Sequence, residues 1–221
     1  SVCDTRMYSS TREEVAVAEA VSARRTHTRD KLVDAAIVTF AEKGVLGASV
    51  EEICDTAGFT RGAFYSNFDG KDALCLAILA RQASAQLEAS HQAIASLADA
   101  DAGLDGLVGH AIAVFLGTQR RDRASLLAMA ELRLYAVREE SFRAGYLAFF
   151  ERVSREFVEL IERTASEFGY RLAVPGTQAI AVLQGVYEQS AIASLLAGEQ
   201  GDAPDRAALL AGDMASMLDE A

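Results

Sequence analysis

The amino-acid sequence predicts an all-α protein of about nine helices. Ala, Leu and Glu are frequent, Pro occurs only twice and Trp is absent, a composition that favours helices. Hydrophobic residues make up 51% of the 221 residues, which is enough to bury a large core. This length suits one compact unit or two small cooperating domains. We predict a flexible arm over residues 1–27, a compact helical domain over 28–74 and a larger helical domain over 75–221.

The first predicted helix begins at Thr28. The preceding segment allows a helical turn or two over residues 13–23, but it has few large apolar residues. We interpret it as a mobile arm that ends in Arg24 and Arg25. From Thr28 onward, apolar residues recur at the spacing of one helix face, namely Leu32, Val33, Ala36, Ile37 and Phe40. Gly44 is expected to end this helix as a C-terminal cap.

Residues 49–57 form the second predicted helix. Ser49 and Glu52 have the spacing of a capping box, in which the Ser hydroxyl and the Glu carboxylate satisfy free backbone N–H groups. An apolar stripe follows, made by Val50, Ile53, Cys54 and Ala57. Gly58 can adopt the left-handed conformation of a tight turn, and Thr60 can cap the next helix at once. Two short helices joined by such a turn form the helix-turn-helix pattern.

The third predicted helix has an unusually bare outer face. Phe64 and Phe68 are four residues apart and share the buried side. The opposite side carries small residues and polar neighbours, which are Gly62, Ala63, Ser66, Arg61, Tyr65 and Asn67. Because a face of small residues lets a helix enter a major groove, the pattern predicts a DNA reader.

The remaining chain is helical in pattern. A fourth helix is expected from Lys71 towards His91, with Leu74, Ile78 and Leu87 on its buried side. Further helices are expected near residues 104–117, 123–137, 140–168, 176–197 and 205–219, separated by segments that contain Gly or Pro.

The overall charge opposes a nucleic-acid partner. The net charge is −11, and residues 1–74 contain nine Lys and Arg against twelve Asp and Glu. DNA binding must therefore depend on a few cations at the right places, which makes it sensitive to salt.

The sequence shows no motif typical of a metal site, a cofactor site or an enzyme active site. The three cysteines form no C-x-x-C pair, and the three histidines have neither metal-ligand spacing nor a neighbouring nucleophile. Without a Gly-rich phosphate loop, we expect no metal, no cofactor and no enzymatic activity. No apolar run is long enough for a membrane span or a signal core, which favours a cytoplasmic location. A scaffold or dimerisation protein is the remaining alternative, and an electrophoretic mobility shift would distinguish it.

The stretch from Arg29 to Leu79 resembles the TetR (tetracycline-repressor-like) family. The typical residues are Phe40-Ala-Glu-Lys-Gly44, Ala57-Gly58, Arg61-Gly62-x-x-Tyr65, Phe68 and Lys71-x-x-Leu74. This sequence has Asp69-Gly70 where the family usually has Pro-Ser, and Ser66-Asn67 where it often has a larger polar residue and a His. The resemblance implies a ligand-responsive regulator, usually a repressor with activation as the alternative, that binds a palindromic operator as a homodimer.

The expected DNA contacts follow from the predicted reader and from the resemblance. Tyr65 and Arg29 are expected on phosphate, Lys71 in a phosphate clamp at a helix N-terminus, and Arg61 on guanine edges or phosphate. The residues expected to contact DNA are Arg29, Ser49, Thr60, Arg61, Gly62, Ala63, Tyr65, Ser66, Asn67 and Lys71.

Two further sets follow from apolar stripes in the second domain. The first set predicts a pocket for a small apolar or amphipathic effector, with Glu131 or Arg133 as a polar anchor. The residues expected to line it are Phe115, Met129, Leu132, Tyr135, Tyr146, Phe149, Phe150, Gln184 and Tyr187. A homodimer interface, which the resemblance favours, is expected among Ile180, Leu183, Val186, Ala191, Leu195, Leu210, Met214 and Met217. An intramolecular core is the alternative for both sets.

Overall fold

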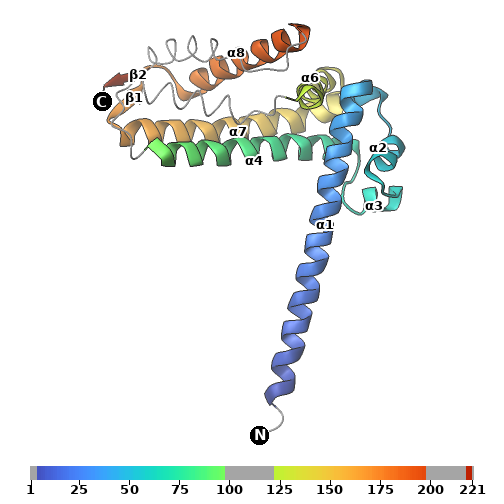
Figure 1. Cartoon of the computed structure of the whole chain (residues 1–221). Helices are drawn as coiled ribbons and strands as arrows, with labels where there is room; N and C mark the ends of the chain where they lie inside the picture. The colour runs from blue at the N-terminus through green and yellow to red at the C-terminus, as the bar shows by residue number, and fades with distance from the viewer. Residues whose placement is uncertain (1–3, 98–121, 198–217, 221) are drawn as a thin grey trace.

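The computed structural model describes residues 4–97, 122–197 and 218–220 (Figure 1). These residues confirm the all-α class. The order of elements is α1 (Asp4–Gly47), α2 (Val50–Ala57), α3 (Arg61–Tyr65), α4 (Lys71–Leu97), α6 (Arg123–Arg138), α7 (Glu140–Glu167), β1 (Tyr170–Leu172), α8 (Gly176–Ala197) and β2 (Leu218–Glu220). The helix expected near residues 104–117 lies outside the described residues.

Helix α1 is longer than the sequence pattern predicted. It begins at Asp4, and its N-terminal part projects from the rest of the protein (Figure 1). Residues 4–27 are therefore helical, which is more helix than the sequence predicted, and the flexibility of the arm over residues 1–27 stays a prediction. The segment lacks Pro and Gly and contains many Ala and Glu, so it has good intrinsic helix propensity even without a large apolar stripe. The domain boundaries themselves stay a prediction.

Gly44 marks the place where the chain changes direction at the end of α1. Its φ of 71° and ψ of 163° are not helical, and a side chain would be strained there. A Cβ at this position would lie 2.8 Å from Oε2 of Glu131 on α6. Gly44 therefore allows both the turn and the close approach of α6.

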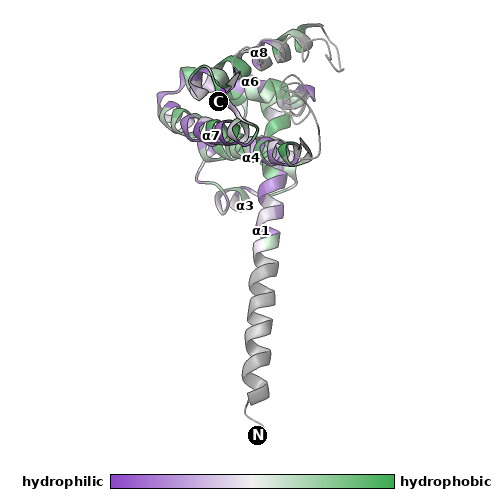
Figure 2. Ribbon diagram, turned by 90° about the vertical axis from the view of Figure 1, so that its left-hand side faces the viewer, coloured by the Kyte–Doolittle hydropathy of each residue, from purple (hydrophilic) through white to green (hydrophobic). Residues whose placement is uncertain are grey.

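A single hydrophobic cluster runs from the helix-turn-helix into the larger helical part. Phe40 and Leu74 belong to it at one end, and Leu132, Phe142 and Leu183 belong to it further along the bundle. Figure 2 shows hydrophobic residues on α1 where that helix joins the other helices. Because α1 packs against α2, α4 and α6, the position of the helix-turn-helix is tied to the bundle.

A short antiparallel pair of strands departs from the predicted pattern. Gly169, with a φ of 80°, follows α7, and β1 then pairs with β2 so that Tyr170 lies opposite Glu220. The helix expected over residues 205–219 is wrong for Leu218 and Asp219, which lie in β2, and its other residues lie outside the description. A strand whose partner is so distant in sequence depends on tertiary contacts, and local propensity cannot predict it.

Crossing a membrane requires a helix that is both long and apolar. None of the helices within residues 4–97 and 122–197 is long and apolar enough to cross a membrane.

Candidate nucleic-acid interface and cavity

The capping box at the start of α2 is confirmed. Ser49 Oγ accepts a hydrogen bond from the Glu52 backbone N–H at 3.2 Å, and Glu52 Oε2 accepts one from the Ser49 N–H at 2.9 Å. Lys43 Nζ also donates to Glu52. The hydrogen bond from Lys43, followed by those from Ser49, lowers the pKa of Glu52 to about 2. These contacts fix where α2 begins.

This capping network predicts a pH dependence of stability. Because the pKa of Glu52 is lower in the folded protein than its ordinary 4.5, its stabilising charge is fully present above pH 4.5 and is lost as the pH falls through 2. Glu52→Gln keeps the capping hydrogen bond without the charge. Thermal unfolding should show a stability difference between wild type and variant that shrinks between these pH values. A difference independent of pH would contradict the role of the charge.

The turn between α2 and α3 has the predicted geometry. Gly58 has a φ of 72° and a ψ of 30°, the left-handed conformation expected of a glycine at a helix end. Thr60 then caps α3 by accepting a hydrogen bond from the Ala63 backbone N–H at 3.2 Å. Phe64 is fully buried, and its ring centroid lies 5.6 Å from that of Phe68. The two rings fix which side of the short helix faces outward.

The outward side of α3 is open, as predicted from its small residues. Arg61, Gly62 and Ser66 are exposed, and Tyr65 is 51% exposed. Among the described atoms, only Thr60 Oγ1, at 3.7 Å, lies near the position of a Cβ on Gly62. Packing within the chain therefore does not require a small residue at position 62, and a close external contact would account for it.

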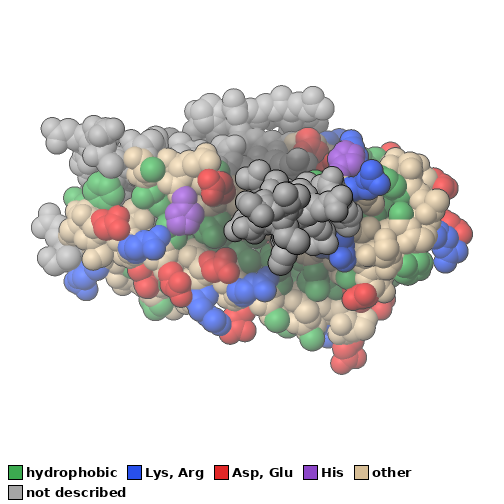
Figure 3. All heavy atoms as spheres, turned by 90° about the horizontal axis from the view of Figure 1, so that it is seen from below, with side chains coloured by type: hydrophobic (Ala, Val, Ile, Leu, Met, Phe, Trp, Pro, Cys, Tyr) green, Lys and Arg blue, Asp and Glu red, His purple; other side chains and the backbone are tan. Residues whose placement is uncertain are grey.

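Arg61 places a positive charge on this surface, and the exposed Arg25 places another, with its Nη2 3.5 Å from the Ser66 carbonyl. The Arg61 guanidinium contacts the Glu51 carboxylate at 2.8 Å, and both side chains are more than half exposed. Hydrogen bonds with Tyr65 and Glu51 raise the pKa of Arg61. Figure 3 shows acidic and basic side chains interspersed on the face of the molecule seen from below. Arg61 is thus held at the surface by a carboxylate that an incoming phosphate would have to replace.

Arg29 is turned away from the outer surface. Its Nη1 donates to the Asn67 backbone carbonyl at 2.7 Å, and its guanidinium lies 4.3 Å from the centroid of the Phe68 ring. The expected phosphate contact is therefore not the contact this side chain makes in the structure. Arg29 instead holds the C-terminal end of α3 against α1, because a guanidinium satisfies a free carbonyl and stacks on an aromatic ring.

Lys71 is also directed inward. Its Nζ donates to the backbone carbonyls of Val45 at 2.7 Å and Ala48 at 3.1 Å, and lies 5.9 Å from the centroid of the Tyr135 ring. In the structure Lys71 thus contacts the C-terminal end of α1 and the short loop that follows it, and its predicted phosphate contact stays a prediction. The side chain is half-buried, so leaving these carbonyls unpaired would be costly.

We expect Lys71→Met to reduce stability and leave the salt dependence of DNA binding unchanged. Two carbonyls lose their donor, which should lower the free energy of unfolding by about 1–3 kcal/mol. A true phosphate contact would instead reduce the slope of log affinity against log salt by about 1. Denaturant unfolding and DNA titrations at several salt concentrations distinguish the two roles. Lys31→Met, at an exposed position on α1, is the matched control.

The other expected DNA contacts divide between the surface and the interior. Ser49 and Thr60 are exposed, whereas Ala63 is half-buried. Asn67 is half-buried too, and its Nδ2 donates to the Ala63 carbonyl at 2.8 Å. Six of the expected residues are thus exposed, namely Ser49, Thr60, Arg61, Gly62, Tyr65 and Ser66.

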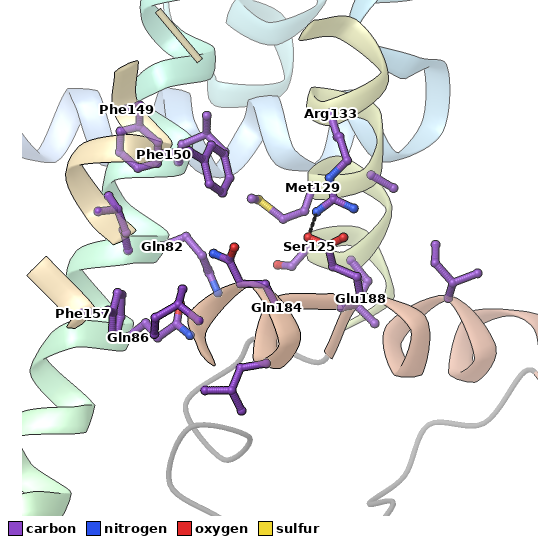
Figure 4. A pocket seen from close by; sticks show the side chains of 18 residues that line it. Gln82, Gln86, Ser125, Met129, Arg133, Phe149, Phe150, Phe157, Gln184 and Glu188 are labelled. Atoms are coloured by element: carbon purple, nitrogen blue, oxygen red, sulfur yellow. Dashed lines mark hydrogen bonds and ion pairs between the residues drawn. The ribbon is translucent and has the colours of Figure 1, made fainter. Parts of the chain in front are cut away.

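A separate cavity of about 130 Å³ lies between α4, α6, α7 and α8 (Figure 4). Its apolar wall includes Met129, Phe149, Phe150 and Phe157. Its polar wall has two oppositely charged side chains and three amides, which are Arg133, Glu188, Gln82, Gln86 and Gln184. Apolar walls with a few polar groups are typical of small-molecule sites.

The cavity contains some of the residues expected in an effector pocket. Met129, Phe149, Phe150 and Gln184 line it, as does the suggested anchor Arg133. Tyr146 is not part of its wall, but its ring lies 4.5 Å from that of Phe150. Phe115 and the side chain of Tyr187 lie outside the described part of the chain.

Leu132, Tyr135 and Glu131 lie on another side of α6. Leu132 is fully buried in the shared core, and the Tyr135 hydroxyl donates to Asp72 Oδ1 at 2.8 Å. Glu131 lies next to Gly44 instead of the cavity. Placing these residues in the pocket was wrong because α6 is surrounded by other helices, so its apolar residues do not all share one partner. One side of α6 faces the cavity, and another faces the helix-turn-helix.

Sequence reasoning missed several residues of the cavity wall. Gln82 and Gln86 are four residues apart on α4, a spacing that could have marked one polar face. Ser125 and Glu188 give no comparable signal, because a serine or glutamate on a helix is usually solvated. The pairing of Arg133 with Glu188 joins residues 55 positions apart and appears only in the folded protein.

The expected dimer residues on α8 face partly inward. Ile180 and Leu183 are buried in the core and line the cavity, so they do not form an outer surface. Leu195 is half-buried. The side chains of Val186 and Ala191, and all of Leu210, Met214 and Met217, lie outside the description. The large apolar residues that α8 exposes are different ones within the described part, namely Val182, Ile192 and Leu196.

Comparisons with known proteins support the interpretation of the N-terminal part. Residues 32–78 match the family described as "Bacterial regulatory proteins, tetR family". The chain is 39% identical over 64 residues to the transcriptional regulator SrpR of Pseudomonas putida, covering 29% of this chain and 30% of SrpR. It is 34% identical over 80 residues to the repressor KstR2 of Rhodococcus jostii, covering 36% and 39% respectively. The matches thus span about a third of these relatives' length.

Solved structures share the fold over most of the chain. A protein described as a TetR-family regulator from Rhodococcus sp. has a TM-score of 0.68 at 18% identity, covering 87% of this chain and 98% of that one. FadR from Bacillus subtilis, solved in complex with stearoyl-CoA, has a TM-score of 0.62 at 14% identity, covering 84% and 97%.

The fold and the geometry around α3 define a helix-turn-helix protein with an attached helical bundle. Residues 32–78 are similar to the TetR family of bacterial regulatory proteins, and most of the chain shares its fold with a solved structure described as a TetR-family regulator.

Proposed function

We propose that this protein is a DNA-binding transcriptional regulator that recognises a palindromic operator as a homodimer and responds to a small ligand. The observation that carries the proposal is the open outer face of α3 around Gly62, which packing within the described chain does not require. The names of SrpR and KstR2, a regulator and a repressor, support a role in repression. A cytoplasmic location goes with this role.

The reader would insert the exposed face of α3 into the major groove. Arg61, at its N-terminal end, would reach a guanine edge or a phosphate, and Tyr65 would donate to a phosphate. The free backbone N–H groups at the start of α2, beside the exposed Ser49, would meet another phosphate. Arg29 and Lys71 would act indirectly, by holding α3 and the preceding loop in place.

Replacing Glu51 by glutamine is expected to strengthen operator binding. The Glu51 carboxylate pairs with Arg61 and lies on the proposed DNA side, so it competes with phosphate for the guanidinium. Removing one such charge should raise affinity by roughly three- to tenfold at low salt. Fluorescence anisotropy with labelled operator would measure the change. Glu151→Gln, on the exposed side of α7, should have no effect, and unchanged or weaker binding by Glu51→Gln would contradict the competition.

A dimer would place two readers on two half-sites. A single reader as short as α3 makes few base contacts, and paired half-sites supply the missing specificity. The exposed apolar residues Val182 and Leu196, which do not line the cavity, give α8 an outer surface suited to a partner helix. Sedimentation analysis should show a dimer at micromolar protein concentration, and a monomer would contradict this part of the proposal.

The cavity would provide the effector site, and α6 would connect it to the reader. Met129 and Arg133 on α6 line the cavity, while Tyr135 on the same helix holds Asp72 at the start of α4. A ligand that favours one position of α6 would therefore shift the population of reader arrangements. FadR of B. subtilis, which shares the fold, was solved with stearoyl-CoA, so relatives of this architecture bind ligands.

The proposal is tested by an electrophoretic mobility shift with DNA from around the protein's own gene. A specific complex that resists competition by unrelated DNA would support a regulator. If the protein is a scaffold instead, it should form no complex with any genomic DNA fragment, and that result would overturn the proposal.

A further inference from the structure

The polar wall of the cavity has balanced charge. Arg133 on α6 and Glu188 on α8 form an ion pair there, with side chains 42% and 37% exposed. The Tyr146 hydroxyl also hydrogen-bonds to Arg133; burial raises the pKa of Tyr146, and Arg133 partly opposes that effect. The two charges therefore already satisfy each other before any ligand enters (Figure 4).

Ser125 adds an unsatisfied group to the same wall. The residue is only 5% exposed, and its hydroxyl has no hydrogen-bond partner among the described atoms. Its backbone N–H is already used, because it donates to the Asp122 side chain at the start of α6. A buried hydroxyl without a partner costs free energy, so it indicates a position where a bound molecule can supply a donor or an acceptor.

The size of the cavity limits the ligand. Its volume of about 130 Å³ is close to that of engineered protein cavities, about 150 Å³, that bind benzene. Phe149, Phe150 and Phe157 supply faces and edges against which a ring can pack. The part of the ligand that the cavity encloses therefore has about the size of one six-membered ring.

The charge balance selects among polar groups on such a ring. A carboxylate would have to compete with Glu188 for Arg133, and an ammonium would have to compete with Arg133 for Glu188. Either ligand would leave one partly buried charge uncompensated, which is unfavourable. A hydroxyl or amide can instead bond to Ser125 or Gln184 without breaking the ion pair.

We propose that the cavity binds a compact neutral molecule with a ring-sized apolar body and one hydroxyl or amide group that bonds to Ser125. The inference rests on the proposed function only in treating the cavity as the effector site. It specifies the charge and size of the effector, which the fold alone leaves undefined.

Three small molecules of similar shape but different charge test which ligand charge the cavity prefers. Isothermal titration calorimetry of the full chain at neutral pH would compare benzyl alcohol, benzoate and benzylamine. Benzyl alcohol should bind with a dissociation constant on the order of 1 mM, as expected for so small a ligand. The two charged probes should bind at least about tenfold more weakly. Equal or tighter binding of a charged probe, or no binding of benzyl alcohol up to its solubility, would overturn the proposal.

Variants of the ion pair should reduce this preference for the neutral probe. Glu188→Gln frees Arg133 and should raise benzoate affinity roughly tenfold, while Arg133→Gln should do the same for benzylamine. Glu151→Gln and Arg155→Gln alter an exposed ion pair on α7 and should leave all three affinities unchanged. Circular dichroism would verify that each variant is folded. If neither cavity variant raises the affinity of its charged probe, the ion pair does not select the ligand.

Ser125→Ala tests the hydrogen bond. Binding of benzyl alcohol should weaken roughly three- to tenfold, whereas toluene, which lacks the hydroxyl, should bind equally to both proteins. An equal loss for both probes would show that Ser125 only shapes the cavity, which contradicts its proposed bond. DNA binding without a ligand is measured separately, so a protein that shifts operator DNA but binds no probe overturns this inference and not the proposed reader.

Discussion

Phe64→Ala is expected to destabilise the protein by about 3–5 kcal/mol, the usual cost of removing a large aromatic side chain from a core. Phe64 is fully buried, and its ring lies 5.2 Å from the Tyr65 ring and 5.6 Å from the Phe68 ring. It is the one fully buried residue in a helix of five residues, so little else holds α3 in place. The loss is a large part of the ~5–15 kcal/mol by which domains are stable.

Denaturant unfolding monitored by circular dichroism would measure this effect, with operator affinity measured on the same samples. Operator binding should be lost together with stability, because α3 no longer has a fixed orientation. Val38→Ala, at a position 42% exposed on α1, should change stability by less than about 0.5 kcal/mol. A Phe64→Ala protein with unchanged stability would show that the ring does not anchor α3.

Gly62→Glu should abolish operator binding while the fold stays intact. Only Thr60 Oγ1 lies within 4 Å of a Cβ at this position among the described atoms, so the new side chain has room. In a groove it would meet bases and place a negative charge beside phosphates. We expect affinity to fall at least about a hundredfold, since close approach and charge are both lost.

A matched control separates shape from net charge. Gln178→Glu adds the same charge at an exposed position on α8, far along the chain from α3, and should leave operator affinity unchanged. Thermal unfolding of Gly62→Glu should match that of the wild type. Operator binding that survives this substitution would mean that DNA does not contact the face around Gly62.

The local structure of the reader was predictable from the sequence, because its signals are short in range. The capping box of Ser49 and Glu52 and the left-handed turn at Gly58 each involve residues within a few positions of one another. The orientation of α3 also followed from the spacing of two phenylalanines, Phe64 and Phe68. Short-range hydrogen bonds and one-sided burial are the features that periodicity reports.

The directions of long charged side chains were not predictable. Arg29 and Lys71 lie at positions typical of phosphate contacts, yet both donate to backbone carbonyls, of Asn67 and Val45 respectively. Which carbonyls are left unpaired depends on how loops from distant parts of the chain are placed. Periodicity indicates which face of a helix carries a side chain. It does not identify the atoms of other segments that the side chain contacts in the folded protein.

Periodicity also failed to assign the apolar residues of the helical bundle to their partners. The stripe on α8 correctly indicated an apolar helix, but Ile180 and Leu183 pack inside the protein while Val182 and Leu196 remain exposed. A helix with apolar residues on several sides gives no signal that assigns one side to a core and another to a partner. The unpartnered Ser125 hydroxyl likewise becomes visible only when its surroundings are known.

Selection of random double-stranded DNA by the wild-type chain tests the central claim, that the outer face of α3 reads DNA in a dimer. We expect enrichment of a palindromic sequence whose half-sites lie about one helical turn apart, or a multiple of it. The Gly62→Glu protein should enrich none of that sequence. No enriched sequence with the wild type, or the same sequence with Gly62→Glu, would contradict the claim.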